Sequence, residues 1–142
     1  MNEMGGLMNN NFVFETRLKN DFSEGISACT RVEVLIQCKD DIIIIPLAAK
    51  GCVGDLYVYA CGKSLSSKDT DLSNLGCDLR EWNHLKVETI NKKMSIYVNE
   101  RLACSFEFPN DPSGIVGLQY RFNGPGAVKE TRLESAGEEF DF

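Results

Sequence analysis

Apolar and polar residues alternate along most of the chain with a period of two. In the clearest segments, aliphatic or aromatic side chains occupy every second position, and charged or hydroxyl side chains occupy most positions between them. The alternation runs through residues 12–19, 31–37, 85–89, 94–98 and 102–108. Because successive side chains of a β-strand point to opposite faces of a sheet, this period predicts strands that bury one face and expose the other.

Four further segments predict strands by other signals. Residues 42–45 are a continuous run of isoleucine, which suits a strand covered on both faces. Pro46 is expected to end that strand or to place it beside a sheet edge, because proline cannot donate to a ladder of hydrogen bonds. Residues 56–61 are apolar or aromatic on both faces, and residues 116–122 and 127–133 flank a turn rich in glycine and proline.

The segments between the strands predict turns and one long loop. Short polar stretches at 91–93 and 99–101 divide residues 85–108 into a three-stranded meander. From 62 to 78 the alternation dissolves into Ser, Lys, Asp, Asn and Gly, which predicts a long loop with one helical turn near 71–75. A loop of this length is uncommon without a purpose, so it is either a solvated crossover between sheets or a functional rim.

About nine short strands and no helical periodicity predict an all-β domain, because large sheets must bury one face against another. We expect a two-sheet antiparallel β-sandwich over residues 12–133. Residues 1–11, rich in Gly and Asn, are expected to form a linker or a disordered N-terminus. Residues 134–142 are acidic and are expected to form a frayed tail. The sequence contains no internal repeat.

Residues 82–101 combine a tryptophan, an alternating strand, a short turn and a second strand that ends in Val-Asn. Together with residues 117–128, they resemble the central segment and the last hairpin of concanavalin A-like lectin/glucanase domains, a superfamily that includes laminin G-like modules. The resemblance implies a jelly roll. Glu100 stands where that family usually has Gly, and we therefore expect a loop longer than a type I′ turn, which needs positive φ at both central residues.

Trp82 has two interpretations. As a large side chain directly before a strand, it is expected to plug one end of the sandwich, with its indole N–H on a hydrogen-bond partner. The alternative is that its ring stacks on a sugar.

Charge and hydropathy exclude two kinds of partner. The net charge is −6, and the densest basic pair, Lys92 and Lys93, lies in a predicted turn. With no basic patch, nucleic acid is not an expected partner. No segment reaches the roughly 18 apolar residues of a membrane-spanning helix, so no membrane insertion of this domain is expected.

The compartment has two interpretations. The N-terminus lacks the positive flank and apolar core of a signal peptide. The protein is cytoplasmic if Met1 is the native start, and extracytoplasmic or on the cell surface if the domain was cut from a larger exported bacterial protein.

The cysteines are predicted to be mostly reduced residues that pack inside the domain. There are six, at positions 29, 38, 52, 61, 77 and 104. Several lie in predicted strands, where a free cysteine behaves as a small hydrophobe. No Cys-x-x-Cys pair occurs and His84 is the only histidine, so a zinc site has almost no support. No cofactor is expected.

The resemblance raises the question of catalysis. Glucanases of this fold carry a Glu-x-Asp-x-Glu strand, and retaining chemistry needs two carboxyl groups about 5 Å apart. Here Glu33 and Glu88 each lack a carboxylate two residues away. Glu15 paired with Glu33 across strands remains an alternative. A serine or cysteine nucleophile would have to recruit His84. We therefore predict no catalysis, with a glycoside hydrolase using Glu33, Glu88 or Glu15 as the alternative.

Binding is the remaining class of function. Sugar recognition uses an aromatic face beside planar polar groups, which Tyr57, Tyr59, Tyr97, Tyr120 and Arg121 would supply if they shared a concave face. The resemblance also implies calcium at the rim of several relatives; the oxygen donors on offer form no recognised calcium loop. These donors are Asp69, Asp71, Asn110 and Asp111. The prediction is a non-catalytic recognition module for a glycan or a protein; the further alternative is a structural or dimerisation domain.

Overall fold

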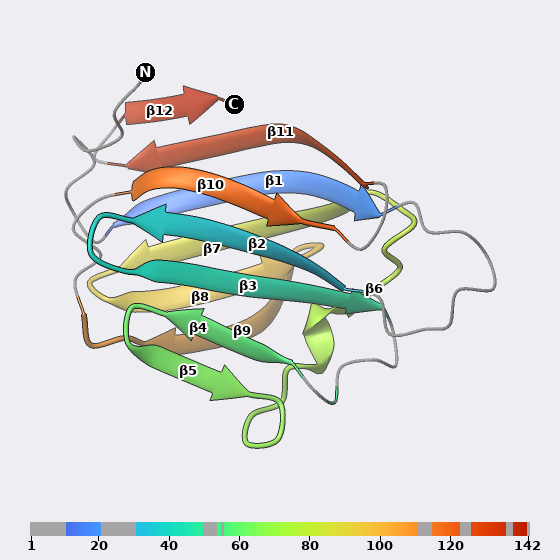
Figure 1. Ribbon diagram of the computed structural model, residues 1–142, viewed down its shortest axis with the longest axis horizontal. Coiled ribbons are helices and arrows are strands. Elements are labelled where there is room, and N and C mark those ends of the chain that lie inside the picture. The colour runs from blue at the N-terminus through green and yellow to red at the C-terminus, as the bar shows by residue number, and fades with distance from the viewer. Residues whose placement is uncertain are drawn as a thin grey trace.

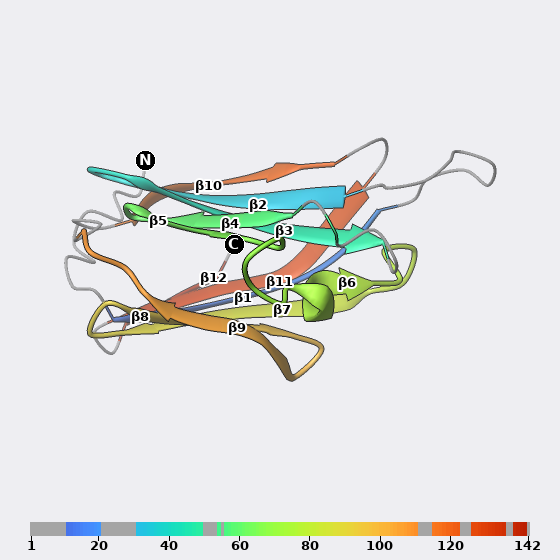
Figure 2. The ribbon, with the colours of Figure 1, turned by 90° about the horizontal axis from the view of Figure 1, so that it is seen from below.

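Strands, nearly all of them antiparallel, account for most of the residues that the computed structural model describes, which are 11–20, 31–49, 54, 56–110, 115–122, 126–135 and 138–141. They form two sheets that pack face to face (Figures 1 and 2). Sheet A has the strand order β12-β11-β1-β7-β8-β9, and sheet B has the order β10-β2-β3-β4-β5. The predicted all-β sandwich of two antiparallel sheets is confirmed.

The chain crosses between the sheets after β1, β6, β9 and β10. Sheet A consists of β1 (Phe12–Asn20), β7 (Asn83–Ile90), β8 (Lys93–Val98), β9 (Arg101–Glu107), β11 (Gly126–Ser135) and β12 (Glu138–Asp141). Sheet B consists of β2 (Arg31–Cys38), β3 (Ile42–Ala49), β4 (Tyr57–Ala60), β5 (Lys63–Ser66) and β10 (Ile115–Arg121). A short strand, β6 (Gly76–Cys77), pairs in parallel with the end of β3.

The inward face of each sheet contributes to one hydrophobic core. In β7 and β8, every second residue is buried, as the alternation predicts. The largest fully buried side chains include Phe14, Leu18, Ile36, Ile43, Ile45, Leu85, Met94 and Ile96. Because these side chains come from strands of both sheets, their burial is the interaction that holds the two layers together.

The predicted meander β7-β8-β9 is present, and both of its turns have two residues. Asn99 has φ 51° and Glu100 has φ 70°, so the expectation of a longer loop at Glu100 is wrong. A type I′ turn matches the twist of the flanking strands. The strand pairing that this match allows outweighs the cost of placing a residue in the left-handed region, about 1–2 kcal/mol. Asn99 strengthens this turn, because its backbone N–H donates to the His84 carbonyl at 2.8 Å and its side chain accepts from the His84 N–H at 2.9 Å.

Strand β3 runs through Pro46, so the expectation that this proline ends the strand is wrong, whereas the alternative, a position beside an unpaired edge, holds locally. Pro46 lies opposite Glu33 of β2. The pairing of β3 with β4 is confined to Ile43 and Ile44, so Pro46 lies beyond the last residue that needs a β4 partner. The missing N–H therefore removes no hydrogen bond from that ladder.

The predicted long loop contains regular structure. The 3₁₀ helix η2 (Ser73–Leu75) confirms the predicted helical turn. The loop interpretation is wrong for β5 and β6. Strand β5 has the sequence KSLS and lies at the edge of sheet B, where Leu65 alone of its residues packs against the core. Its backbone pairing with β4, rather than its side-chain pattern, makes it a strand.

The acidic C-terminal segment also differs from expectation. Residues 138–141 form β12, which pairs with β11 from Arg132 to Ser135. The prediction of a frayed tail is therefore wrong for these residues. An edge strand of a large sheet offers free backbone hydrogen-bonding groups, and these order a polar segment that has no core of its own.

Four cysteines in the described part of the chain are buried and form no disulfide: Cys38, Cys61, Cys77 and Cys104. Cys29 and Cys52 lie outside the described residues. Burial raises the pKa of Cys104 to about 11, so its thiol is protonated at neutral pH. These side chains behave as packing residues, in agreement with the interpretation drawn from the sequence.

We expect Cys104 in the folded protein to react with a thiol reagent at pH 8 at least about 100-fold more slowly than in denaturing urea, because only the thiolate reacts and an unburied cysteine has a pKa near 8.5. Mass-spectrometric mapping of alkylated peptides measures both rates. Rapid alkylation of Cys104 under native conditions would contradict its burial.

Candidate binding site

The four tyrosines proposed as ligand contacts lie in three different places, the outer faces of the two sheets and the space between the sheets. Tyr57 and Tyr59 alternate with the buried Val58 and Ala60, and therefore lie on the outer face of sheet B. Tyr97 lies on the outer face of sheet A, with the Lys86 ammonium 5.8 Å from its ring centroid. They cannot form one aromatic platform.

Tyr120 lies between the sheets. Its ring packs against the core, and its hydroxyl is 3.3 Å from the hydroxyl of Thr131 in sheet A. Thr131 in turn lies 2.9 Å from the hydroxyl of Thr16. These hydroxyl contacts join β10 of sheet B to β11 and β1 of sheet A, so Tyr120 contributes to the packing of the sheets.

On the outer face of sheet B, Tyr57 is the more open aromatic residue, with 47% of its surface exposed. The Tyr59 hydroxyl donates to a carboxylate oxygen of Asp41 at 3.1 Å and accepts from the N–H of Gly62 at 3.2 Å. The hydrogen bond to Asp41 raises the pKa of Tyr59. Arg121 lies 3.8 Å from Glu33. Polar contacts within the protein thus engage both Tyr59 and Arg121.

The three candidate catalytic carboxylates lie on two opposite faces. Glu33 points outward from sheet B, whereas Glu15 and Glu88 point outward from sheet A. Packed sheets are about 10 Å apart, and these side chains diverge from them, so the whole sandwich separates Glu33 from both others. The structure therefore does not bring together the pairs of Glu33 with Glu88 or Glu33 with Glu15 that a glycoside hydrolase would need.

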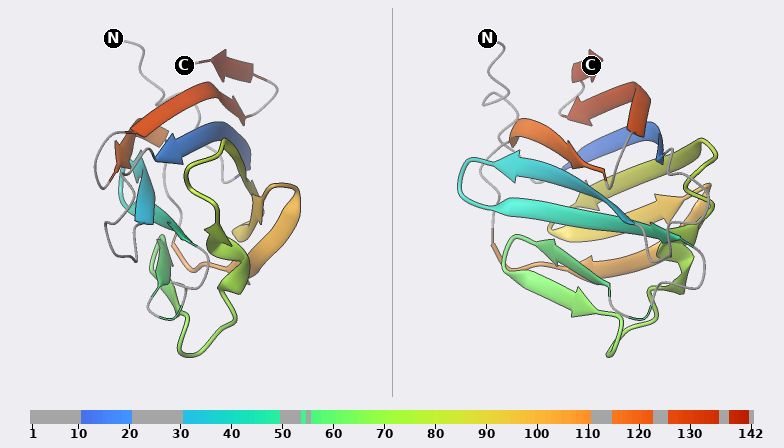
Figure 3. Two further views of the ribbon diagram at one scale, coloured as in Figure 1. Left: turned by 90° about the vertical axis from the view of Figure 1, so that its right-hand side faces the viewer. Right: turned by 45° about the vertical axis from the view of Figure 1, so that its right-hand side comes forward.

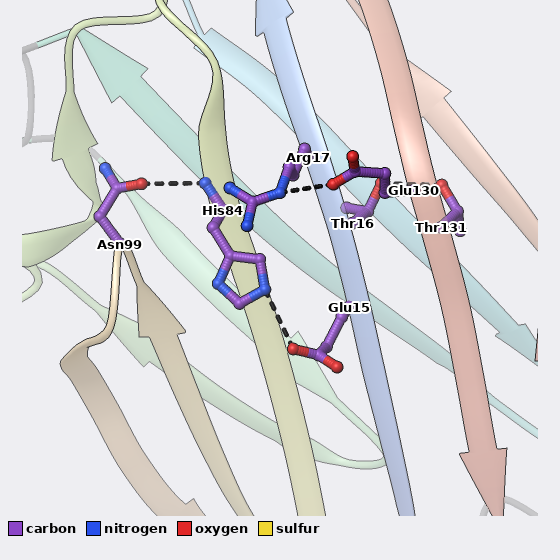
Figure 4. Close-up of polar contacts among 7 residues, drawn as sticks. All are labelled: Glu15, Thr16, Arg17, His84, Asn99, Glu130 and Thr131. Atoms are coloured by element: carbon purple, nitrogen blue, oxygen red, sulfur yellow. Dashed lines mark hydrogen bonds and ion pairs between the residues drawn. The ribbon is translucent and has the colours of Figure 1, made fainter.

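Glu15 and His84 form a contact on the outer face of sheet A (Figure 4). The Nε2 atom of His84 is 3.0 Å from a carboxylate oxygen of Glu15. Nearby, the Arg17 guanidinium lies 2.7 Å from Glu130 of β11 (Figure 4). The partner of the His84 ring is thus a carboxylate on the neighbouring strand, and the pair cross-links β7 to β1.

Of the donors considered for calcium, Asp71 has another partner and Asp111 lies outside the described residues. Asp71 accepts from the N–H of Ser73 at 3.0 Å, and hydrogen bonds from Ser73 lower the pKa of Asp71. In the part of the chain that the structure describes, no three His, Cys, Asp or Glu side chains are grouped so as to hold a metal ion. No described helix is long and apolar enough to span a membrane.

A pocket of about 470 Å³ opens at one end of the sandwich, between the segment that leads from η2 into β7 and the turn from β8 to β9. Figure 3 (left) looks onto this end of the molecule. The pocket is lined by amides, carboxylates, a guanidinium and an indole: Asn74, Asn83, Asn99, Asp78, Glu81, Arg101 and Trp82. Asn74 and Asp78 belong to the region 62–78 that the sequence marked as a crossover or a functional rim, and the other residues named here lie outside it.

Trp82 does not plug the sandwich, because 37% of its surface is exposed. The next residue, Asn83, takes the inward position at 3% exposure, and strand alternation then turns Trp82 outward. Two ammonium groups lie over its ring, that of Lys129 at 4.1 Å and that of Lys19 at 5.2 Å from the ring centroid. The prediction of a core tryptophan is wrong. Strand alternation, counted back from the inward residues Leu85 and Val87, makes residue 83 inward and Trp82 outward.

Asn83 holds the pocket wall in place. Its amide nitrogen donates to the backbone carbonyls of Asp78 at 2.8 Å and Glu81 at 2.9 Å, and its amide oxygen accepts from the Asn99 side chain at 2.9 Å. This buried amide thereby ties the segment before β7 to the β8–β9 turn. Apart from Trp82, the pocket residues were not identified from the sequence, because they come from separate segments and form no local motif.

The other polar groups of the pocket are arranged by short-range contacts. A carboxylate oxygen of Asp78 accepts from the backbone N–H of Arg80 at 3.1 Å and lies 3.5 Å from the Arg80 guanidinium. The Asn74 amide donates to the Leu102 carbonyl at 3.2 Å. The pocket therefore presents carboxylate, amide and guanidinium groups beside an indole, which is the combination that hydroxyl-rich ligands with apolar faces require.

Comparison with known proteins supports the fold. No family model and no curated protein sequence matches the chain. The carbohydrate-binding module CBM66 from Bacillus subtilis is similar in structure, with a TM-score of 0.61 and 19% identity over 89% of this chain and 76% of that one. Galectin LEC-6 from Caenorhabditis elegans has a TM-score of 0.61 and 14% identity over 90% and 85%. Sheep galectin-11 has a TM-score of 0.59 and 11% identity over 88% and 90%.

These solved structures have the concanavalin A-like jelly-roll fold. The chain shares this fold, and the resemblance seen in the sequence is confirmed at the level of the fold.

Proposed function

We propose that the domain is a non-catalytic carbohydrate-binding module and that the pocket beside Trp82 is its binding site. The observation that carries the proposal is the position of a partly exposed tryptophan on a pocket lined by amide, carboxylate and guanidinium groups. The volume of about 470 Å³ lies within the range of small-molecule sites, roughly 300–1,000 Å³. The similarity in fold to a carbohydrate-binding module and to galectins supports this choice of ligand class.

The chemistry of sugars matches these side chains. A sugar ring has apolar C–H faces, which pack against an indole, and hydroxyl groups, which bind planar amides, carboxylates and guanidinium groups. Arg101 and Glu81 offer a donor and an acceptor on the same pocket. Asn83 and Asn99 order the wall through their mutual hydrogen bond, so the pocket is formed before a ligand arrives.

We expect Trp82→Ala to lower the affinity for a bound glycan at least about 30-fold, because a tryptophan at the centre of a site contributes about 2 kcal/mol or more. A glycan array identifies the ligand, and isothermal titration calorimetry measures the affinity. Tyr57→Ala and Tyr97→Ala are matched controls, since they remove aromatic residues from the outer faces of sheets B and A, and we expect affinity changes below about twofold for both.

Three outcomes would contradict the proposal. A large loss in Tyr57→Ala with none in Trp82→Ala would move the site to sheet B. The absence of binding across a broad array by the natively folded protein would exclude a carbohydrate-binding module. Release of shorter oligosaccharides from a bound glycan would show catalysis.

A further inference from the structure

Basic side chains gather around Trp82 although the protein as a whole is acidic, with a net charge of −6. The ammonium groups of Lys129 and Lys19 both lie over the indole, and Arg101 lines the adjoining pocket. Of the two pocket carboxylates, Asp78 is partly offset by Arg80 at 3.5 Å. The side of the site that faces β1 and β11 is therefore positive, whereas the carboxylates lie in the segment that precedes β7.

A β-bulge in β11 places Lys129 at this position. Glu15 pairs with Arg132 and Arg17 pairs with Lys129, so Glu130 and Thr131 together lie opposite Thr16. Thr131 points inward and is 5% exposed. Without the extra residue, alternation would direct Lys129 toward the core; with it, Lys129 shares the outer face with Arg17 and Lys19.

The bulge contains a strained residue. Glu130 has φ 52°, a left-handed conformation that is unfavourable for a residue with a side chain. The Glu130 carboxylate reaches the Arg17 guanidinium at 2.7 Å (Figure 4). The bulge thus pairs Arg17 with an anion on its own sheet while it brings Lys129 to Trp82. Bulges commonly re-aim side chains beside functional sites.

The pairing of β1 with β7 places the second lysine. Leu18 lies opposite Asn83, so Lys19 and Trp82 are the next residues along the two strands. Lys19 and Lys129 thus bring two ammonium groups to one indole ring. An anion bound beside this ring would gain charge-assisted hydrogen bonds from both.

From this geometry we infer that the site selects acidic glycans: a carboxylate or sulfate group on the sugar binds between Lys19 and Lys129, while the ring lies against Trp82 and its hydroxyl groups enter the pocket. The inference rests on the proposed carbohydrate-binding function and specifies its ligand class. The pocket carboxylates, Asp78 and Glu81, then accept from sugar hydroxyls on the side away from the acidic group.

Matched glycan pairs test the selection. A uronate oligosaccharide is compared with its methyl ester, and a sulfated galactan oligosaccharide with its desulfated form, by calorimetry at 50 and 300 mM NaCl. We expect at least one acidic member to bind about tenfold or more tightly than its neutral counterpart, and its affinity to fall at the higher salt concentration, because salt screens exposed charges. The two pairs distinguish a carboxylate from a sulfate as the recognised group.

Lysine substitutions test the position. We expect Lys19→Gln and Lys129→Gln each to lower the affinity for the acidic glycan about fivefold, with little effect on the neutral one. Lys86→Gln is the matched control, since Lys86 also lies over an aromatic ring, that of Tyr97, but on another part of sheet A. Circular dichroism confirms that each variant is folded.

The outcomes separate this inference from the proposed function. If neutral glycans bind as tightly as acidic ones and Trp82→Ala abolishes both, the acidic selection is wrong and the binding function stands. Acidic binding that survives Lys19→Gln and Lys129→Gln together would also overturn the inference. If neither member of either pair, nor any glycan on the array, binds, the proposed function itself fails.

Discussion

Phe14→Ala is expected to lower the free energy of unfolding by about 3–5 kcal/mol, because it removes a fully buried aromatic side chain and leaves a cavity. Phe14 is 0% exposed. It lies in β1, between Leu133 of β11 and Val87 of β7. Strand β1 is central in sheet A, so its neighbours are held on both sides and cannot easily collapse into the space. Urea denaturation followed by circular dichroism measures the change.

The adjacent residue provides the control. Val13 lies on the outer face of the same strand, where it is half-buried. We expect Val13→Ala to cost less than about 1 kcal/mol, since much of its side chain remains in contact with water. Equal losses for Phe14→Ala and Val13→Ala would contradict the assignment of inward and outward faces in β1.

Asn83→Ala is expected to lower the free energy of unfolding by about 2–4 kcal/mol and to weaken glycan binding at least about tenfold. The substitution leaves the carbonyls of Asp78 and Glu81 and the side-chain amide of Asn99 without their partner. Buried polar groups that lose a partner cost about 1–3 kcal/mol each, and relaxation toward water reduces that cost. The pocket wall then loses the contacts that order it.

Two variants sharpen this result. Asn83→Asp keeps the shape but removes both N–H donors, so we expect a loss at least as large as that of Asn83→Ala, because a carboxylate would face two carbonyl oxygens. Asn74→Ala removes an exposed amide with one hydrogen bond, to Leu102, and should cost less than about 1 kcal/mol. If Asn83→Ala binds glycan as wild type does, the pocket is not the binding site.

Not every element was predictable from side-chain pattern. Strands β1, β2 and β7–β9 follow from alternation, because each contributes its own inward residues to the core. Strands β5 and β12 lie at sheet edges and are ordered by backbone pairing with a neighbour. Their side chains show little of the apolar–polar alternation by which a strand is recognised in a sequence.

The tyrosines and carboxylates chosen as candidates illustrate the same limit. The outward positions of Tyr57 and Glu33 follow from the alternation of their own strands. Whether two outward residues share a face depends on which sheet each strand joins, and that depends on pairings between distant segments. Glu33 and Glu15 therefore looked equivalent in sequence but lie on opposite sides of the sandwich.

The amino-acid sequence by itself determined the all-β class, the meander of β7-β8-β9 and the inward and outward positions within the strands that alternate. These properties depend on neighbouring residues along one strand. The tertiary structure alone decided that the ammonium groups of Lys19 and Lys129 lie over the Trp82 ring, and that Asn83 orders the wall of a pocket. Those contacts depend on strand register and on a bulge at Glu130, which are set by the joint packing of strands far apart in the chain.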